Sequence, residues 1–155
     1  PTIRSRCISF AVAPVSPEDC ARYCTAQGVG AKDAALYSAL FDGHIGTVLA
    51  AARDEARREQ VDRALALAKA AAARDSYAAA VLLAAYEKDK AGASALLADF
   101  RAVAAAGLRD SPHSPVEGET ARKALGAADA AMQQISAQVN PKIVLSVLAA
   151  KFRTF

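Results

Sequence analysis

The chain has 155 residues, with 19 Lys and Arg against 16 Asp and Glu, and a formal net charge of +3. Alanine, the strongest helix former, fills about a quarter of the positions, whereas aromatic residues make up only 6% and tryptophan is absent. This composition argues against an all-β fold and against an aromatic platform for stacking nucleic-acid bases. The mixed charge argues against a dedicated polyanion-binding protein, which needs clustered basic residues.

One short strand is predicted at the start of the chain. Residues 7–12 alternate, with Ile8, Phe10 and Val12 on one face. A single strand cannot satisfy its own backbone hydrogen bonds, so its partners are expected in residues that precede this sequence. The chain also opens on Pro1 instead of an initiator methionine. We therefore expect these residues to be a fragment of a longer protein.

Three short helices are predicted next. The first begins at Ser16, a good N-cap, with Pro17 at the first helical position, and it ends at Gly28. The second covers about 31–41. A glycine turn at 42–46 separates it from the third, and together the three form a small bundle.

Longer helices follow, and they predict a second helical bundle. They are expected at about 54–74, from 75–76 onward, at 91–108, at 119–138 and from 141 to the C-terminal region. The helix after 75–76 has Tyr77 and Val81 on one apolar stripe. In the last helix Ile143, Val144, Val147, Leu148 and Phe152 are predicted to face inward. The charged run at 53–63 is interpreted as a solvated face, with a docking surface as the alternative.

The cysteines and histidines suggest no catalytic or metal site. Cys20 and Cys24 lie four residues apart and could share a metal, but nothing nearby completes a tetrahedral ligand set, so they are interpreted as buried structural residues. His44 is interpreted as a turn or cap residue and His113 as a solvated loop residue. The odd cysteine count favours a reduced, cytoplasmic protein without a disulfide framework.

Three motifs, in this order along the chain, carry a resemblance to a known family. They are Ser5-Arg6-Cys7 before the strand, the turn from Gly43 to Gly46, and Asn140-Pro141-Lys142 after a long amphipathic helix. This arrangement resembles the clamp-loader subunits of the AAA+ family, and among them the delta-prime subunits of bacterial DNA polymerase III. The resemblance covers essentially the whole chain.

The resemblance implies an all-α fold with a short strand remnant. Residues 1–13 would be the remnant of an AAA+ ATPase domain, 14–56 a three-helix lid, and 57–155 a helical collar domain that joins subunits into a ring. The implied function is in DNA replication, as a stator subunit that helps to load the sliding clamp on primed DNA. The implied partners are the gamma/tau and delta subunits, the clamp and the DNA, within a complex that has nucleotidyltransferase activity as a whole, and no membrane is involved.

In that family the arginine of Ser-Arg-Cys contacts the ATP of a neighbouring subunit, and here this position is Arg6. A guanidinium suits such a role because it stays charged and its planar fork matches phosphate oxygens. The chain has no phosphate-binding loop and has glycine where ATP-binding members carry a lid arginine, so no cofactor is expected in the fragment and ATP and Mg²⁺ are expected on its neighbours. Two alternatives stay open: an ATP-binding motor subunit of the same family, and a stand-alone helical adaptor or DNA-binding module.

Overall fold

The computed structural model describes residues 15–155. The predicted strand and the residues Ser5, Arg6 and Cys7 lie outside the described residues. Within 15–155 every regular element is helical, which confirms the all-α class for this part of the chain. The elements in chain order are α1 (Pro17–Ala26), α2 (Ala31–Leu40), α3 (Ile45–Arg53), α4 (Glu55–Ala72), α5 (Ser76–Ala84), α6 (Lys90–Leu108), α7 (Gly118–Ser136), α8 (Pro141–Lys151) and the short 3-10 helix η2 (Phe152–Thr154).

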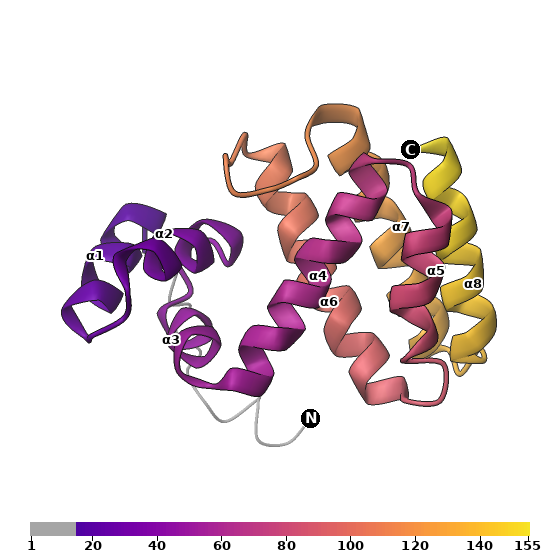
Figure 1. The fold of residues 1–155 in the computed structure, drawn as a ribbon, viewed down its shortest axis with the longest axis horizontal. Coiled ribbons are helices and arrows are strands. Elements are labelled where there is room, and N and C mark those ends of the chain that lie inside the picture. The colour runs from indigo at the N-terminus through magenta and orange to yellow at the C-terminus, as the bar shows by residue number, and fades with distance from the viewer. Residues whose placement is uncertain (1–14) are drawn as a thin grey trace, which may run out of the picture.

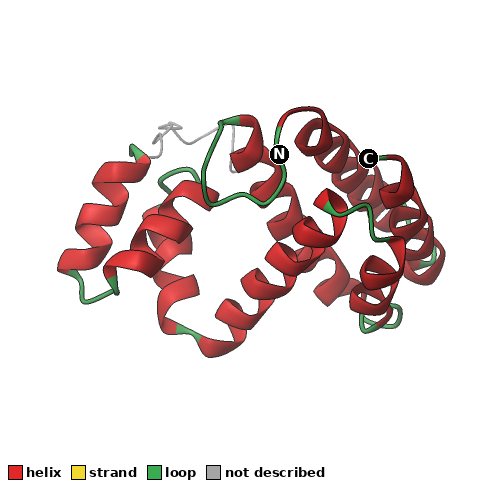
Figure 2. Ribbon diagram, turned by 45° about the horizontal axis from the view of Figure 1, so that its top comes forward, coloured by secondary structure: helices red, strands yellow, loops and turns green. Residues whose placement is uncertain are grey.

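The described helices form two groups, which lie side by side along the longest axis of the molecule (Figure 1). Helices α1–α3 make a three-helix unit, and α4–α8 with η2 make a five-helix unit. Only Asp54 separates α3 from α4, and its extended backbone conformation lets the chain change direction there (Figure 2). The two helices are therefore not continuous across the region where the lid was predicted to meet the collar.

Several helix starts follow directly from the sequence. The Ser16 hydroxyl accepts a hydrogen bond from the backbone N–H of Asp19 at 3.1 Å, and Pro17 occupies the first turn, as predicted. The Asn140 side chain accepts from the N–H of Lys142 at 2.9 Å, with Pro141 next to it. At its end, α1 is closed by Gly28 with φ +87°, a conformation that favours glycine.

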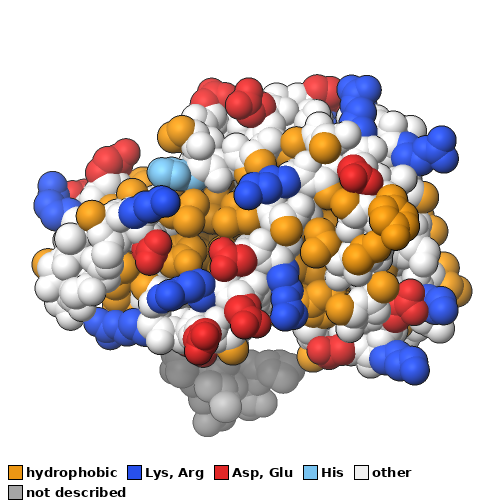
Figure 3. Space-filling model, viewed as in Figure 1, with side chains coloured by type: hydrophobic (Ala, Val, Ile, Leu, Met, Phe, Trp, Pro, Cys, Tyr) orange, Lys and Arg blue, Asp and Glu red, His pale blue; other side chains and the backbone are white. Residues whose placement is uncertain are grey.

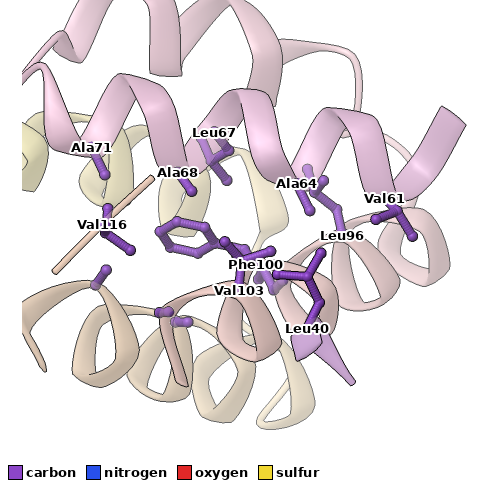
Figure 4. Packing of buried hydrophobic residues seen from close by; sticks show 14 of the residues in the cluster. Leu40, Val61, Ala64, Leu67, Ala68, Ala71, Leu96, Phe100, Val103 and Val116 are labelled. Carbon is purple, nitrogen blue, oxygen red and sulfur yellow. The ribbon is translucent and has the colours of Figure 1, made fainter. Parts of the chain in front are cut away.

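The core of the five-helix unit is organised around α6, which packs against α4 on one side and α7 on the other. Alanines of α4 allow the two backbones to approach closely, and Figure 4 shows Ala64 and Ala68 pointing toward Phe100 of α6. The ring of Phe100 stacks on that of Phe152, with centroids 5.9 Å apart, and Phe155 packs on Phe152 in turn. The C-terminal end is thereby fixed to the core.

Helix α6 is the one described helix that has the length and hydropathy of a membrane-spanning segment. Half of this apolar stretch is buried inside the bundle, between α4 and α7. A core helix of a soluble bundle passes the same test, and α6 has that position here.

The three-helix unit has a smaller interior. Its buried residues are Cys20, Cys24, Val29, Ala34, Tyr37, Ser38, Leu40, Phe41, Val48 and Ala51, together with the backbone of the tight turn at Gly43. The two cysteines are free and fully buried, so the structural interpretation made from the sequence is confirmed for both.

One predicted packing face was wrong. Ile143 and Val147 of α8 were expected to face inward, but their side chains are 59% and 46% exposed. Helix α8 instead buries Val144, Leu145 and Leu148. Because this helix carries apolar residues around most of its circumference, periodicity alone could not select the buried face.

Candidate functional site

The structure places the described motif residues far apart. Gly43 and Gly46 belong to the turn between α2 and α3 in the three-helix unit, whereas Asn140 and Pro141 begin α8 at the opposite end of the molecule (Figure 1). The two motifs therefore do not form one site. Arg6 lies outside the described residues, so its predicted role stays a prediction.

The two glycines of the turn have different structural roles. Gly43 has φ +73°, follows Asp42 with φ +52°, and lies so close to the backbone of Val15 that a Cβ atom would overlap the Val15 carbonyl. Glycine is therefore required there for conformation and for space. Gly46, in the first turn of α3, has open space around it and an ordinary helical φ, so nothing in the structure requires glycine at this position.

The candidate ligands of the three-helix unit do not gather into a metal site. Within residues 15–155 no group of three or more His, Cys, Asp or Glu is arranged to hold a metal ion. Burial, together with the neighbouring Cys20 thiol, raises the pKa of Cys24, so its thiol stays protonated near neutral pH. His44 is the N-cap residue of α3, and its side chain makes no capping hydrogen bond.

A charged pair within the five-helix unit lies against the three-helix unit. Arg57 of α4 binds the Asp99 carboxylate of α6 through both terminal nitrogens, with Nη2 at 2.6 Å from Oδ1. The Asp99 side chain is only 6% exposed. The Arg57 guanidinium also lies 5.5 Å from the centre of the Phe41 ring, which belongs to the turn after α2. We refer to Phe41, Arg57 and Asp99 as the inter-unit joint.

The joint corrects one sequence interpretation. Arg57 belongs to the charged run at 53–63 that was predicted to be solvated, but its guanidinium binds the buried Asp99 carboxylate. These hydrogen bonds raise the pKa of Arg57 and outweigh the opposing effect of burial. The partner Asp99 is 42 residues away in the sequence, inside an apolar helix. A lone acidic residue within such a helix is the signal that could have identified the pair, because buried carboxylates need a partner.

A second polar contact between the units borders a cavity of about 250 Å³. Arg109, just after α6, donates to the carbonyl of Ala39 at 3.3 Å and lies 3.6 Å from the Asp42 carboxylate. Arg101, which also lines the cavity, binds Asp129 of α7. Both guanidiniums therefore already have acidic partners within the described residues, and the cavity lies between the two units.

Two exposed apolar surfaces remain on the five-helix unit. The first is a groove of about 540 Å³ between α4 and α5, where Tyr77 and Val81 are 79% and 57% exposed. Figure 3 shows hydrophobic side chains gathered over this part of the molecule. We call it the α4–α5 groove. The sequence had predicted an apolar stripe through Tyr77 and Val81, and the structure leaves that stripe outside the core.

The second surface is formed by Ile143 and Val147, which are four residues apart on α8, and by Val139, which precedes the helix. We call it the α8 row. Val147 also lines a shallow depression between α7 and α8. Among residues 15–155, α7 has no large hydrophobic side chain that is exposed, so α7 does not contribute to the α8 row.

Comparison of the chain with models of protein families, with curated protein sequences and with solved structures finds no significant match. The arguments about function therefore depend on the residues and geometry described above.

Proposed function

We propose that the chain is the lid and collar part of a delta-prime-like clamp-loader subunit, acting as a stator while the DNA polymerase III complex loads the sliding clamp on primed DNA. The order of its motifs, from Ser5-Arg6-Cys7 through Gly43 to Asn140-Pro141, supports this assignment. So does the sequence of units, because a three-helix unit is followed directly by a five-helix unit. In this proposal the three-helix unit is the lid and the five-helix unit is the collar.

The observation that carries an assembly role is the α8 row. Ile143 and Val147 extend into solvent on a helix whose other apolar residues are buried. Exposed, contiguous apolar residues on a rigid helix are typical of a surface that packs against a partner. We assign the α8 row to the contact with the next collar domain, with gamma/tau and delta subunits as the neighbours.

The chemistry in this proposal belongs to the neighbours. They bind ATP and Mg²⁺, and Arg6 reaches across the subunit boundary to stabilise charge on the transferred phosphoryl group. The chain itself then acts as a rigid stator and supplies one guanidinium, and it works in the cytoplasm without binding a nucleotide.

The proposal is tested by reconstitution. The intact parent protein is mixed with the gamma/tau and delta subunits of the same organism, and complex formation is followed by size-exclusion chromatography. We expect the protein to enter the complex, Ile143→Glu to weaken its entry, and Leu108→Glu, a change at another exposed apolar residue outside the row, to leave it unchanged. Failure of the parent protein to join the complex would refute the proposal.

The trans-acting role of Arg6 has its own readout. In the reconstituted complex, Arg6→Ala is expected to reduce DNA-stimulated ATP hydrolysis while leaving assembly intact. Hydrolysis equal to that of the unmodified complex would remove Arg6 from the site. Stoichiometric ATP binding by the isolated parent protein would instead identify it as a motor subunit.

A further inference from the structure

The α4–α5 groove has no role in the function proposed above. Its floor consists of small side chains of α4, namely Ala66, Ala70 and Ala73. Its wall is a ridge on α5 formed by Tyr77 and Val81, which are four residues apart and lie on one helix face. A groove of small residues thus runs directly beside a ridge of large ones.

A surface that carries a ridge and an adjacent groove can be complementary to itself. In a two-fold interface the same patch occurs on both copies, so the ridge of each copy lies in the groove of the other. Helices prefer this arrangement, in which ridges of side chains pack into grooves. The exposed tyrosine is also the kind of residue that contributes strongly at the centre of interfaces.

The charges at the edge of the groove support the same pairing. Lys69 of α4 and Asp75 at the start of α5 both line it, and they form no ion pair with each other or with any other described residue. Asp75 uses Oδ1 to cap α5, accepting from the N–H groups of Tyr77 and Ala78 at 3.0 and 2.9 Å, which leaves Oδ2 available. A two-fold pairing that sets Lys69 of each copy against Asp75 of the other would make both contacts attractive.

We propose that the α4–α5 groove binds a second copy of this chain in a two-fold dimer. The ridge of Tyr77 and Val81 fills the alanine groove of the partner copy, and two reciprocal Lys69–Asp75 ion pairs set the register. This inference is independent of the clamp-loader proposal, because it uses a different surface and needs no other protein.

The first test is the mass of the 155-residue chain in solution. Sedimentation velocity up to about 100 µM detects dimers with micromolar dissociation constants. We expect a dimer, and we expect Val81→Glu to raise its dissociation constant at least about tenfold, because the change places a charge in the apolar contact. Ile143→Glu on the α8 row is the matched control and should leave the dimer unchanged. A chain that stays monomeric over this range overturns the proposal.

A charge exchange tests the two-fold geometry. Lys69→Glu and Asp75→Lys each place like charges opposite each other in a homodimer, so each variant alone should be largely monomeric. Mixing them restores two attractive pairs, Glu with Lys at one site and Asp with Lys at the other, and should recover a heterodimer. Absence of recovery, with both variants folded by circular dichroism, overturns the reciprocal contact.

The variant Asp75→Asn tests the dimer contact without disturbing the folding of α5. Asparagine caps a helix as well as aspartate does, so α5 should keep its circular dichroism signal. Loss of the charge alone should still weaken the dimer. A dimer as tight as that of the unmodified chain would contradict the role of Asp75.

Discussion

The two units of the molecule are built from similar alanine-rich helices, but their interiors differ. The five-helix unit encloses large side chains that are fully buried: Val61, Leu67, Leu83, Leu96, Leu97, Phe100, Ile135, Leu145, Leu148 and Phe152. The three-helix unit has Leu40 and Val48 in that class, together with the nearly buried rings of Tyr37 and Phe41, and most of the rest of its interior is cysteine and alanine. Each large side chain contributes roughly 1.5–3 kcal/mol when buried, so the five-helix unit has the stronger core.

The helix ends show the same contrast. In the five-helix unit α4, α5, α6 and α8 begin with a side-chain cap from Asp54, Asp75, Asp89 or Asn140. In the three-helix unit only α1 has one, while α2 and α3 begin at Gly30 and His44 without a capping side chain. We infer that the five-helix unit is the stable scaffold and that the three-helix unit opens first. The packing of α2 on α6 and of α3 on α4 holds the two units together, along with the inter-unit joint.

The largest expected effect comes from breaking the scaffold itself. Phe100→Ala removes a ring that is fully buried and stacked on Phe152, and should lower the free energy of unfolding by about 3–5 kcal/mol. Urea denaturation followed by circular dichroism measures the change. Tyr23→Ala, an aromatic truncation at an exposed position outside both proposed interfaces, is the control and should change stability by at most about 0.5 kcal/mol. Equal losses in the two variants would refute the assignment of Phe100 to the core.

The next effect separates the two units at the joint. Arg57→Met leaves the Asp99 carboxylate buried without its partner and should cost about 2–3 kcal/mol, less than a fully buried pair because Arg57 is partly exposed. Hydrogen exchange should accelerate in α4 and α6, which hold the pair, and also in α1–α3, which lose the contact of the Phe41 ring with the guanidinium. The double variant with Asp99→Leu removes both charges and should recover part of the loss. Exchange that stays unchanged in α1–α3 would contradict the role of the joint between the units.

A smaller and more local effect is expected at the turn of the three-helix unit. Gly43→Ala forces a side chain against the backbone of Val15 at a positive φ, which should cost about 1–3 kcal/mol. The buried thiols of Cys20 and Cys24 report the opening of this unit, because alkylation requires exposure. In a Cys7→Ser background, Gly43→Ala should speed alkylation by roughly tenfold or more, since 1.4 kcal/mol corresponds to a factor of ten. The control Gly46→Ala should not speed it.

The buried thiol of Cys24 also makes the free energy of unfolding depend on pH. Because burial raises the pKa of Cys24, the folded state holds its proton more strongly than the unfolded state does. The free energy of unfolding should therefore decrease as pH rises above the pKa of an unfolded thiol, about 8.5. Replacing Cys24 with alanine should remove this part of the decrease.

Local signals in the sequence were sufficient to predict most of the helices. Ser16, Asn140 and Pro141 lie at helix starts because their chemistry acts on the adjacent backbone, which a sequence displays directly. Local signals do not predict which helices pack against each other. Nothing within a few residues of Arg57 indicates Asp99, and only the packing of α4 on α6 brings them together.

The exposed surfaces could not be predicted from local sequence signals either. The sequence displays the apolar residues Tyr77, Ile143 and Val147, but their exposure depends on which face α5 and α8 turn toward the core. In α5 the face with Ala79 and Leu83 is in competition with the face of Tyr77 and Val81 for the core, and it is the one buried, because small residues can pack as closely as large ones. The α4–α5 groove is a consequence of that competition, and it could be found only after the helices were placed.

The smallest expected effect tests whether the two units unfold together. Gly126, in the middle of α7, has open space around it and an ordinary helical φ, so Gly126→Ala should stabilise the five-helix unit by about 0.5–1 kcal/mol. Gly46→Ala has equally open surroundings but lies in the first turn of α3, so its gain should be smaller. If the three-helix unit opens first, Gly46→Ala slows hydrogen exchange only in α1–α3, whereas Gly126→Ala shifts the main urea transition. A single transition that both variants shift equally would show that the joint couples the units into one cooperative fold.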